Sequence, residues 1–210
     1  MEILRKNMNK INITADFTEY KRVFLEENSK RNLISKNDEK FLFEKHIYDS
    51  LGIKLFFKKF NIHSAKILDI GCGGGFPCVP LAIEYPEFKI TGIDSIKKKI
   101  DAINEIKNQL KLDNLSTICD RVENIKEQKF DIITSRAVAD LSKITEYALP
   151  LLKHNGYFVA YKSRKTQEEI GNATKILKRY NAEVKEILTY TLPLEEVYVR
   201  NLVVIEFKNN

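Results

Sequence analysis

Residues 66–75 read KILDIGCGGG, an apolar run with β-branched residues that leads directly into a glycine-rich turn. The run predicts a buried strand over residues 66–70, and the segment from about residue 78 to 85 has the length of a helix that tolerates Pro80 in its first turn. Glycine is required where a backbone turns sharply and a ligand approaches it without an intervening side chain. This stretch therefore predicts a strand, a ligand-binding loop and a helix, the opening unit of an α/β domain.

The segments after this unit repeat the alternation of strand and helix. The expected strands are residues 89–94, 116–119, 130–135 and 156–162, and the expected helices are residues 96–110 and 141–152. Residues 120–129 have the composition of a loop. Strands that alternate with helices pair in parallel through right-handed crossovers, which predicts a doubly wound α/β sheet.

The last third of the chain departs from this rhythm. A helix expected at about residues 166–180 is followed by two long strand patterns, residues 182–189 and 198–207, with only a loop between them. A parallel return needs a crossover of about a dozen residues or more, so these two strands must pair as an antiparallel hairpin. The predicted fold is α/β, with a doubly wound, mostly parallel seven-stranded sheet that ends in an antiparallel hairpin. This is the Rossmann-like layout of class I methyltransferases.

The first part of the chain has a helical pattern, so we expect an N-terminal helical extension over residues 1–62 and a main domain over residues 63–210. Apolar residues recur in the extension every three to four residues, and no proline interrupts them. Asp38 could cap the second helical pattern, and Gly52 lies near its expected end. The apolar positions are Phe17, Tyr20, Phe24, Leu25, Phe41, Phe43, His46, Ile47 and Leu51.

The charge of the chain is moderately basic and uneven. The 210 residues include 35 Lys and Arg against 29 Asp and Glu, a formal net charge of +6, and the excess is larger in residues 1–60 than in the rest. Such a surface attracts polyanions weakly, so charge alone leaves nucleic-acid binding undecided. The start of the chain has no apolar run typical of export or of a membrane span, and we expect a cytoplasmic protein that binds no membrane.

The cysteines and histidines indicate no metal site. Cys72, Cys78 and Cys119 contain no C-x-x-C pair, so each is expected to be a reduced, buried thiol and not a zinc ligand. The three histidines lack the spacing of a catalytic triad or of metal ligands, and we expect them to be packing or surface residues. They are His46, His63 and His154.

The pattern of glycines indicates a particular cofactor. The dinucleotide fingerprint G-x-G-x-x-G needs a glycine at residue 76, where this chain has Phe76. Residues 71–75 read G-x-G-x-G after an acid at the strand end, the pattern that holds S-adenosylmethionine. A second acid, expected at the end of the next strand to accept the ribose hydroxyls, is found 19 residues after the loop. The candidate cofactor residues from this pattern are Asp69, Gly71, Gly73, Gly75 and Asp94.

Two later loops complete the candidate site. Residues 120–123 (DRVE) follow the third strand, where the adenine edge would be read. The exit of the fourth strand, where substrates of open α/β sheets bind, reads Ser135-Arg136-Ala137. It lacks the (N/D)-P-P-(Y/F/W) of enzymes that methylate exocyclic amines and the Pro-Cys of cytosine-C5 enzymes. Arg136 could bond guanine through O6 and N7, or a phosphate, or form only a surface ion pair. Guanine N7 carries no proton, so its methylation would need no general base.

Several short stretches are distinctive in combination. They are residues 31–33 (RNL), 46–51 (HIYDSL), 68–71 (LDIG), 76–77 (FP), 80–83 (PLAI), 94–95 (DS), 98–99 (KK), 121–123 (RVE) and 134–139 (TSRAVA). With these stretches the chain resembles, from about residue 31 to 207, the RsmG/GidB family (glucose-inhibited division protein B). Members of this family are bacterial methyltransferases that modify guanine N7 in 16S ribosomal RNA.

The resemblance implies S-adenosylmethionine as cofactor and a guanine in the 530-loop region of 16S ribosomal RNA as target. It implies that Gly71, Gly73 and Phe76 line the cofactor pocket, that Val122 and Glu123 lie at the adenine, and that Arg136 lies near the methionine end. Arg121 and Lys162 resemble basic residues that hold RNA or the target guanine. The catalytic candidates are therefore Arg136, Arg121 and Lys162. The chain departs from the family at Cys78 and Ser163, where glycine is common, and this leaves the backbone there in doubt.

Other functions remain open from the sequence. The same scaffold could methylate a small molecule or a protein, or could be a non-catalytic RNA-binding module. A dehydrogenase is the weakest alternative, because Phe76 replaces the third fingerprint glycine. For the favoured function we expect 16S ribosomal RNA or the small ribosomal subunit as partner, a monomeric enzyme and no metal ion.

Overall fold

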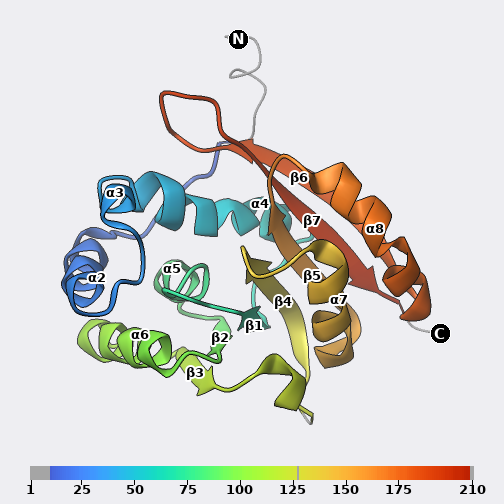
Figure 1. Cartoon of the computed structure of the whole chain (residues 1–210), viewed down its shortest axis with the longest axis horizontal. Helices are drawn as coiled ribbons and strands as arrows, with labels where there is room; N and C mark the ends of the chain where they lie inside the picture. The colour runs from blue at the N-terminus through green and yellow to red at the C-terminus, as the bar shows by residue number, and fades with distance from the viewer. Residues whose placement is uncertain (1–9, 127, 209–210) are drawn as a thin grey trace.

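The computed structural model describes residues 10–126 and 128–208, and its centre is one seven-stranded sheet (Figure 1). The strand order is β3-β2-β1-β4-β5-β7-β6. The strands are β1 (Lys66–Ile70), β2 (Lys89–Asp94), β3 (Leu115–Cys119), β4 (Phe130–Arg136), β5 (Leu152–Lys162), β6 (Ala182–Thr191) and β7 (Val199–Phe207).

The pairing confirms the predicted fold class. β1 pairs in parallel with β2 on one side and with β4 on the other, and β3 and β5 extend the parallel part at its two edges. β7 is antiparallel to both β5 and β6, as expected for a hairpin closed by a short loop. The chain order reverses direction between β1 and β4, so the carboxyl ends of these two strands form the switch point where α/β sheets bind ligands.

The helices of the main domain agree with the sequence prediction to within one residue, apart from the end of one helix. They are α5 (Cys78–Glu84), α6 (Lys97–Leu110), α7 (Leu141–Ala148) and α8 (Thr166–Arg179). The helix predicted over residues 141–152 ends at Ala148 and continues as the 3-10 turn Leu149–Leu151, because Pro150 has no backbone N–H to continue the α-helical hydrogen bonds. β5 begins at Leu152 and not at residue 156, with an irregular register opposite Asp131.

From Thr18 on the N-terminal part is helical, as predicted, but is divided into short pieces; residues 10–17 are not helical, and residues 1–9 of the predicted extension lie outside the described residues. These are α2 (Thr18–Arg31), α3 (Lys36–Glu39), the π-helix η1 (Leu42–Tyr48), the 3-10 turn η2 (Leu51–Ile53) and α4 (Lys54–Lys59). The predicted cap at Asp38 was wrong, because Ser35 caps α3 by accepting a hydrogen bond from Asp38 N. Gly52 does not end the helical segment either. An added Cβ there would lie 2.4 Å from Tyr190, so tertiary contact and not helix termination requires this glycine.

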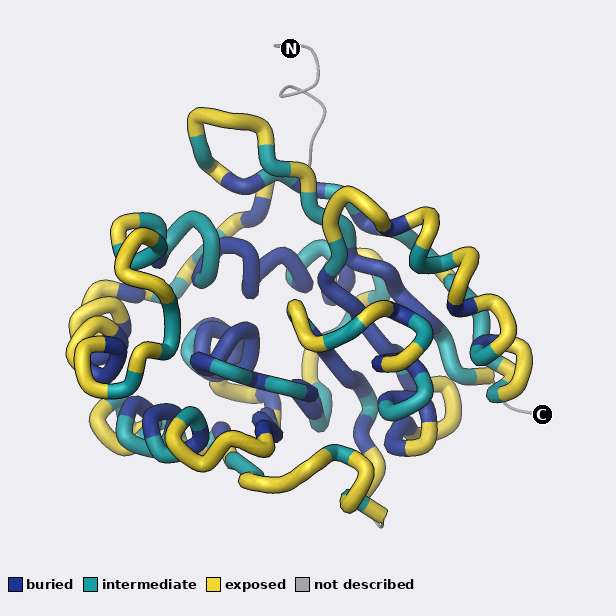
Figure 2. The backbone as a smooth tube through the Cα atoms, in the orientation of Figure 1, coloured by how far each residue is buried: buried dark blue, intermediate teal, exposed yellow. Residues whose placement is uncertain are grey.

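The two faces of the sheet bury two hydrophobic clusters. The N-terminal helices pack with α5 and α6 in one cluster, and α7 and α8 cover the other face. β7 contributes to both, because Leu202 and Val204 point to the first cluster while Val203 and Ile205 point to the second. Figure 2 shows the middle of the sheet as mostly buried, whereas most residues of the edge strands β3 and β6 are half-buried or exposed.

Apolar residues of the N-terminal part enter the same core as the main domain. The Phe24 ring lies 5.1 Å from the Phe76 ring, centroid to centroid, and both side chains are buried. Leu25, predicted on the apolar stripe, is instead 38% exposed, because it lies one position off the buried face of α2. The N-terminal helices therefore share one hydrophobic cluster with the sheet.

Two of the three cysteines are buried, as the sequence predicts. Cys72 and Cys78 are buried free thiols as expected, but Cys119, at the end of the edge strand β3, is exposed.

Within residues 10–126 and 128–208, no helix has the length and apolar character to cross a bilayer, and no group of His, Cys, Asp and Glu has metal-binding geometry.

Candidate active site

The glycine loop leaves β1 in a conformation that only glycine adopts easily. Gly71, Gly73 and Gly75 have φ of 68°, 56° and 93°, in the left-handed region. The loop is attached to β2, because the backbone N–H groups of Gly71 and Cys72 both donate to Ile93 O, at 2.8 and 3.0 Å. An added Cβ at Gly71 would lie 2.4 Å from the Val138 side chain, so the loop and the segment after β4 approach closely here.

Asp69, a predicted cofactor ligand, is completely buried beneath this loop. Its carboxylate accepts hydrogen bonds from Cys78 N at 3.2 Å and from Thr134 Oγ1 at 3.1 Å. Burial raises the pKa of Asp69 to about 7, although both hydrogen bonds act in the opposite direction. The observed contacts connect β1 to the start of α5 and to β4, and Asp69 lines neither of the two pockets described below. The backbone at Cys78, in doubt from the sequence, is that of an ordinary first residue of α5.

Asp94, at the end of β2, faces the glycine loop. Its Oδ2 accepts a hydrogen bond from Gly73 N at 3.0 Å, and its Oδ1 accepts one from Ile96 N at 2.9 Å. Each carboxylate oxygen has a second lone pair, so both can accept another hydrogen bond from a ligand. Lys99 Nζ lies 3.8 Å from Oδ2 and contributes positive charge nearby.

A pocket of about 420 Å³ opens over the ends of β1, β2 and β3. We call it the cofactor pocket. Among the predicted residues, Gly71, Asp94, Arg121, Val122 and Glu123 line it, whereas Gly73, Gly75, Phe76 and Arg136 do not. Arg136, expected near the methionine end of the cofactor, lines the adjacent pocket instead. Its other lining residues are Ile70, Ile93, Ser95, Ile96, Lys99, Asp120, Ala137, Val138 and Tyr147.

The cofactor pocket fits S-adenosylmethionine in size and chemistry. Its volume is in the range of sites for small organic ligands, and its walls combine apolar side chains with a few polar groups. The Asp94 carboxylate at the end of β2 suits ribose hydroxyls, which donate hydrogen bonds. Gly71 has no Cβ, and an added Cβ would clash with the Val138 side chain, which also lines the pocket.

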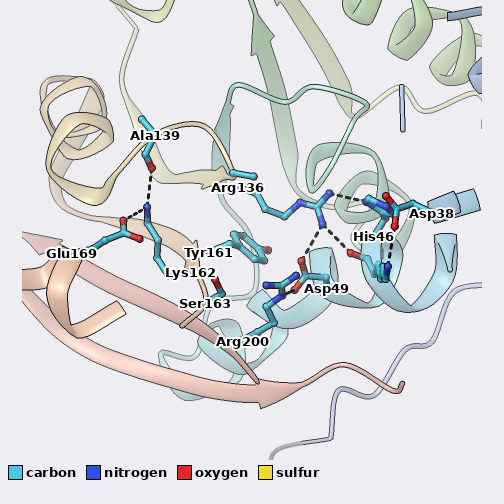
Figure 3. Close-up of a pocket in the computed structure, with 12 residues that line it drawn as sticks. Asp38, His46, Asp49, Arg136, Ala139, Tyr161, Lys162, Ser163, Glu169 and Arg200 are labelled. Carbon is cyan, nitrogen blue, oxygen red and sulfur yellow. Dashed lines mark hydrogen bonds and ion pairs between the residues drawn. The ribbon is translucent and has the colours of Figure 1, made fainter. Parts of the chain in front are cut away.

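A second pocket, of about 460 Å³, lies beside the first (Figure 3). Ala137, at the exit of β4, lines both pockets. We call this second site the acceptor pocket. It is lined by Asp38, Lys45, His46, Asp49, Arg136, Ala137, Ala139, Tyr161, Lys162, Ser163, Glu169 and Arg200. The N-terminal segment thus forms one wall of a pocket whose other walls come from the main domain.

Arg136 is held in the acceptor pocket by three acceptors from the N-terminal segment. Its Nη1 donates to Lys45 O at 3.1 Å and to Asp49 Oδ2 at 3.0 Å, and its Nη2 donates to His46 Nδ1 at 3.1 Å. The guanidinium also lies over the Phe76 ring, 5.1 Å from its centroid. A guanidinium has five N–H donors, so two have no acceptor among the described residues and remain for a ligand.

The other two predicted basic residues are in different surroundings. Lys162 lies in the acceptor pocket with Arg136, where its Nζ donates to Ala139 O at 2.9 Å and pairs with Glu169 at 2.6 Å. Arg121 is exposed and lines the cofactor pocket. The structure therefore brings Arg136 and Lys162 into one pocket and places Arg121 in the adjacent one.

His46 is neutral in this arrangement. An arginine can only donate, so Nδ1 of His46 must be the acceptor and the ring proton lies on Nε2. Burial and the adjacent Arg136 lower the pKa of His46 to about 4. The prediction that His46 is only a packing or surface residue was therefore incomplete, whereas His63 and His154 are exposed.

Sequence reasoning assigned no function to Asp49, Tyr161, Glu169 or Arg200, which also line the acceptor pocket. The stretch HIYDSL contains two of the pocket residues, and its distinctive sequence is the only signal that could have identified them. No spacing rule connects His46 and Asp49 to Arg136, because they lie 90 and 87 positions away from it in the chain.

The strand order with its antiparallel β7, together with a glycine loop and an acid at the end of β2, defines a class I methyltransferase. Solved structures with this fold include a ribosomal protein L11 methylase from Lactobacillus delbrueckii subsp. bulgaricus, with a TM-score of 0.59, 13% identity and coverage of 77% of this chain and 79% of that chain. Another is TYW2 of M. jannaschii in complex with AdoMet, with a TM-score of 0.56, 15% identity and 74% coverage of both chains. At these identities the likeness concerns the fold alone.

The particular family follows from closer relatives. Residues 13–198 match the family described as GidB, rRNA small subunit methyltransferase G, and the chain belongs to this family. It is 40% identical over 188 residues to a ribosomal RNA small subunit methyltransferase G of Oceanobacillus iheyensis, covering 87% of this chain and 78% of the relative. The corresponding protein of Staphylococcus epidermidis is 39% identical over 194 residues, with 90% and 80% covered.

Proposed function

We propose that this protein transfers a methyl group from S-adenosylmethionine to N7 of a guanine in 16S ribosomal RNA, in the 530-loop region of the small subunit. The cofactor pocket holds the adenosine part of the donor, with Asp94 accepting its ribose hydroxyls and Val122 and Glu123 beside its adenine. The acceptor pocket receives the guanine. The observation that carries this proposal is that the two pockets meet at Ala137, at the exit of β4.

The chemistry needs little more than alignment. S-adenosylmethionine supplies an activated methyl group on a sulfonium, and the N7 lone pair forms the new C–N bond as the S–C bond breaks. N7 has no proton to remove, so no general base is required. Arg136 has two free donors for guanine O6 or a flanking phosphate. Correct alignment of two reactants contributes about 7–11 kcal/mol to rate acceleration, which makes positioning the main task of the pocket.

The cations at the acceptor pocket suit an RNA substrate. Lys45 pairs with Asp38, Lys162 with Glu169, and Arg136 and Arg200 share Asp49, so one positive charge is left over. This excess favours a nucleotide over a neutral small molecule. We further propose that the enzyme is a cytoplasmic monomer that acts without a metal ion.

The test is a methylation assay on small ribosomal subunits from a strain that lacks the endogenous enzyme. The protein is incubated with these subunits and radiolabelled S-adenosylmethionine, and the labelled nucleotide is mapped. Label at guanine N7 in 16S ribosomal RNA is expected. Label on a protein or on small molecules only would favour the alternative substrates, and the absence of cofactor binding by calorimetry would favour a non-catalytic module.

The role of Arg136 is tested in the same assay. Arg136→Ala is expected to abolish methylation while leaving S-adenosylmethionine binding within a few-fold of the unmodified chain, because Arg136 lines the acceptor pocket and not the cofactor pocket. Full activity of this folded variant would contradict the proposed role.

A further inference from the structure

The carboxylate of Asp49 is buried where three separate parts of the chain meet. Its side chain is 4% exposed and lies directly after the π-helix η1, in the N-terminal segment. Oδ2 accepts the hydrogen bond from Arg136 on β4, at 3.0 Å. Oδ1 accepts from the Tyr190 hydroxyl on β6 at 2.7 Å and lies 3.4 Å from Nε of Arg200 on β7.

The two oxygens of this one carboxylate therefore have different partners. One engages Arg136, the other is fixed by Tyr190, and Arg200 lies on the same side as Tyr190. Tyr190 is completely buried, and its hydroxyl contacts both the carbonyl oxygen of Asp49, at 3.1 Å, and Oδ1, so the packed ring orients the Asp49 carboxylate. The oriented carboxylate gives one end of the Arg136 guanidinium, Nη1, a fixed acceptor, while His46 Nδ1 accepts from the other end, Nη2.

The helix before Asp49 adds to this geometry. η1 is seven residues of π-helix, a rare conformation that is frequent at functional sites. Its C-terminal end carries partial negative charge, and Lys45 O and His46 Nδ1 there accept two further hydrogen bonds from Arg136. Among the described residues, the Arg136 guanidinium thus donates its three hydrogen bonds to acceptors within residues 45–49. Figure 3 shows His46 and Asp49 beside this guanidinium.

We propose that Asp49 is a positioning residue for methyl transfer: it holds the Arg136 guanidinium so that its two free donors face the acceptor pocket. The N-terminal segment then completes the active site, in addition to any contact that it makes with RNA. This inference rests on the proposed function, because it takes Arg136 to be a residue that contacts the target nucleotide.

The experiment compares Asp49→Asn with the unmodified protein in single-turnover methylation of small subunits, with enzyme in excess so that slow variants remain measurable. Asparagine preserves the shape but removes the charge that pairs with Arg136. The loss of such a charge-assisted hydrogen bond is expected to reduce the rate at limiting subunit concentration about 10- to 100-fold. The Kd for S-adenosylmethionine should stay within about twofold, because Asp49 does not line the cofactor pocket.

A double-mutant cycle separates positioning from a merely structural role. If Asp49 acts through Arg136, Asp49→Asn should change the rate less than about twofold when Arg136 is already alanine, or lysine where the alanine variant gives no measurable rate. Fully multiplicative effects of the two substitutions would overturn the proposal, as would an Asp49→Asn rate within twofold of the unmodified protein.

Glu84→Gln is the matched control. Glu84 is another buried carboxylate that connects the N-terminal segment to the main domain, since it accepts hydrogen bonds from Thr14 N at 3.0 Å and Ala15 N at 2.9 Å and pairs with Lys54. It lines neither pocket. Its substitution should lower the Tm without a comparable loss of rate. An equal loss of rate would show that any weakening of this connection impairs catalysis, which would overturn the specific role of Asp49.

A second variant covers the case in which Asp49→Asn does not fold. Tyr190→Phe removes the hydroxyl that orients Asp49 and keeps the buried ring, and it should lower the rate several-fold only when Arg136 is present. An unchanged rate would contradict the proposal. If the unmodified protein methylates no small subunit, the proposed function is wrong and this inference falls with it, a result that is visible before any variant is compared.

Discussion

Gly71 illustrates how a single missing Cβ defines the cofactor pocket. Its φ of 68° is one that residues with a Cβ rarely adopt, and a Cβ there would lie 2.4 Å from Val138. We expect Gly71→Ala to raise the Kd for S-adenosylmethionine about tenfold or more, because a loss of 1.4 kcal/mol or more is enough for that change. Isothermal titration calorimetry measures it.

Gly171→Ala is the control for the Gly71 substitution. Gly171 lies in α8, and an added Cβ there meets nothing within 4 Å. Alanine is the better helix former, so this variant should gain roughly 0.5–1 kcal/mol of stability and bind the cofactor unchanged. Equal effects of the two substitutions on cofactor binding would show that the Gly71 conformation is not what the pocket requires.

The raised pKa of Asp69 predicts how the folding stability of the protein depends on pH. Its folded-state pKa is raised from 3.8 to about 7, so between these values the folded protein binds more protons at this group than the unfolded chain does. The contribution of Asp69 to stability is therefore greatest at low pH and falls as pH rises toward 7. The slope is at most about 1.4 kcal/mol per pH unit.

Asp69→Asn removes this titration while keeping an acceptor for Cys78 N. The free energy of unfolding in urea, measured for both proteins from pH 4 to 8, should show the variant gaining stability relative to the unmodified protein as pH rises to about 7. A difference that does not change with pH would mean that the carboxyl titrates normally in the folded protein.

At the scale of elements, Gly52 decides how the N-terminal helices dock on the sheet. It lies in η2, where helix propensity alone would favour alanine, yet an added Cβ would lie 2.4 Å from the buried Tyr190 ring. We expect Gly52→Ala to lower the free energy of unfolding by about 1–3 kcal/mol, as other overpacked cores do. Urea denaturation tests this. Gly171→Ala serves as the comparison, because it is expected to raise the free energy of unfolding where Gly52→Ala lowers it.

The elements also show where local patterns are sufficient. β1 and β2 have the predicted bounds, because each is a short, mostly buried run with β-branched residues, a signal encoded within a few residues. The helix over residues 141–152 was predicted too long because its apolar pattern continues through Pro150, where the α-helical hydrogen bonds cannot. The cap at Ser35 and the π-helix η1 depend on local geometry that apolar spacing does not specify.

For the whole molecule, the shared hydrophobic cluster predicts that the main domain depends on the N-terminal segment. Buried residues of both parts, such as Phe24 and Phe76, pack against each other. A chain of residues 63–210 would expose this apolar surface, so we expect it to aggregate or to lack a cooperative unfolding transition. Circular dichroism and size-exclusion chromatography test this. A soluble, cooperatively folded fragment that binds S-adenosylmethionine would instead support two independent folding units.

The sequence by itself determined the fold class, the glycine loop and the acid at the end of β2. These features depend on residue types at short spacing: β-branched runs, glycines that allow positive φ, and an acid a fixed distance further on. Only the tertiary structure decided that Asp69 is buried beneath the loop and that Arg136 is held by residues 45–49. The contacts of Asp69 with Thr134 and of Arg136 with residues 45–49 join positions 65 to 91 residues apart, and such distant contacts depend on how the helices pack on the sheet and not on any local pattern.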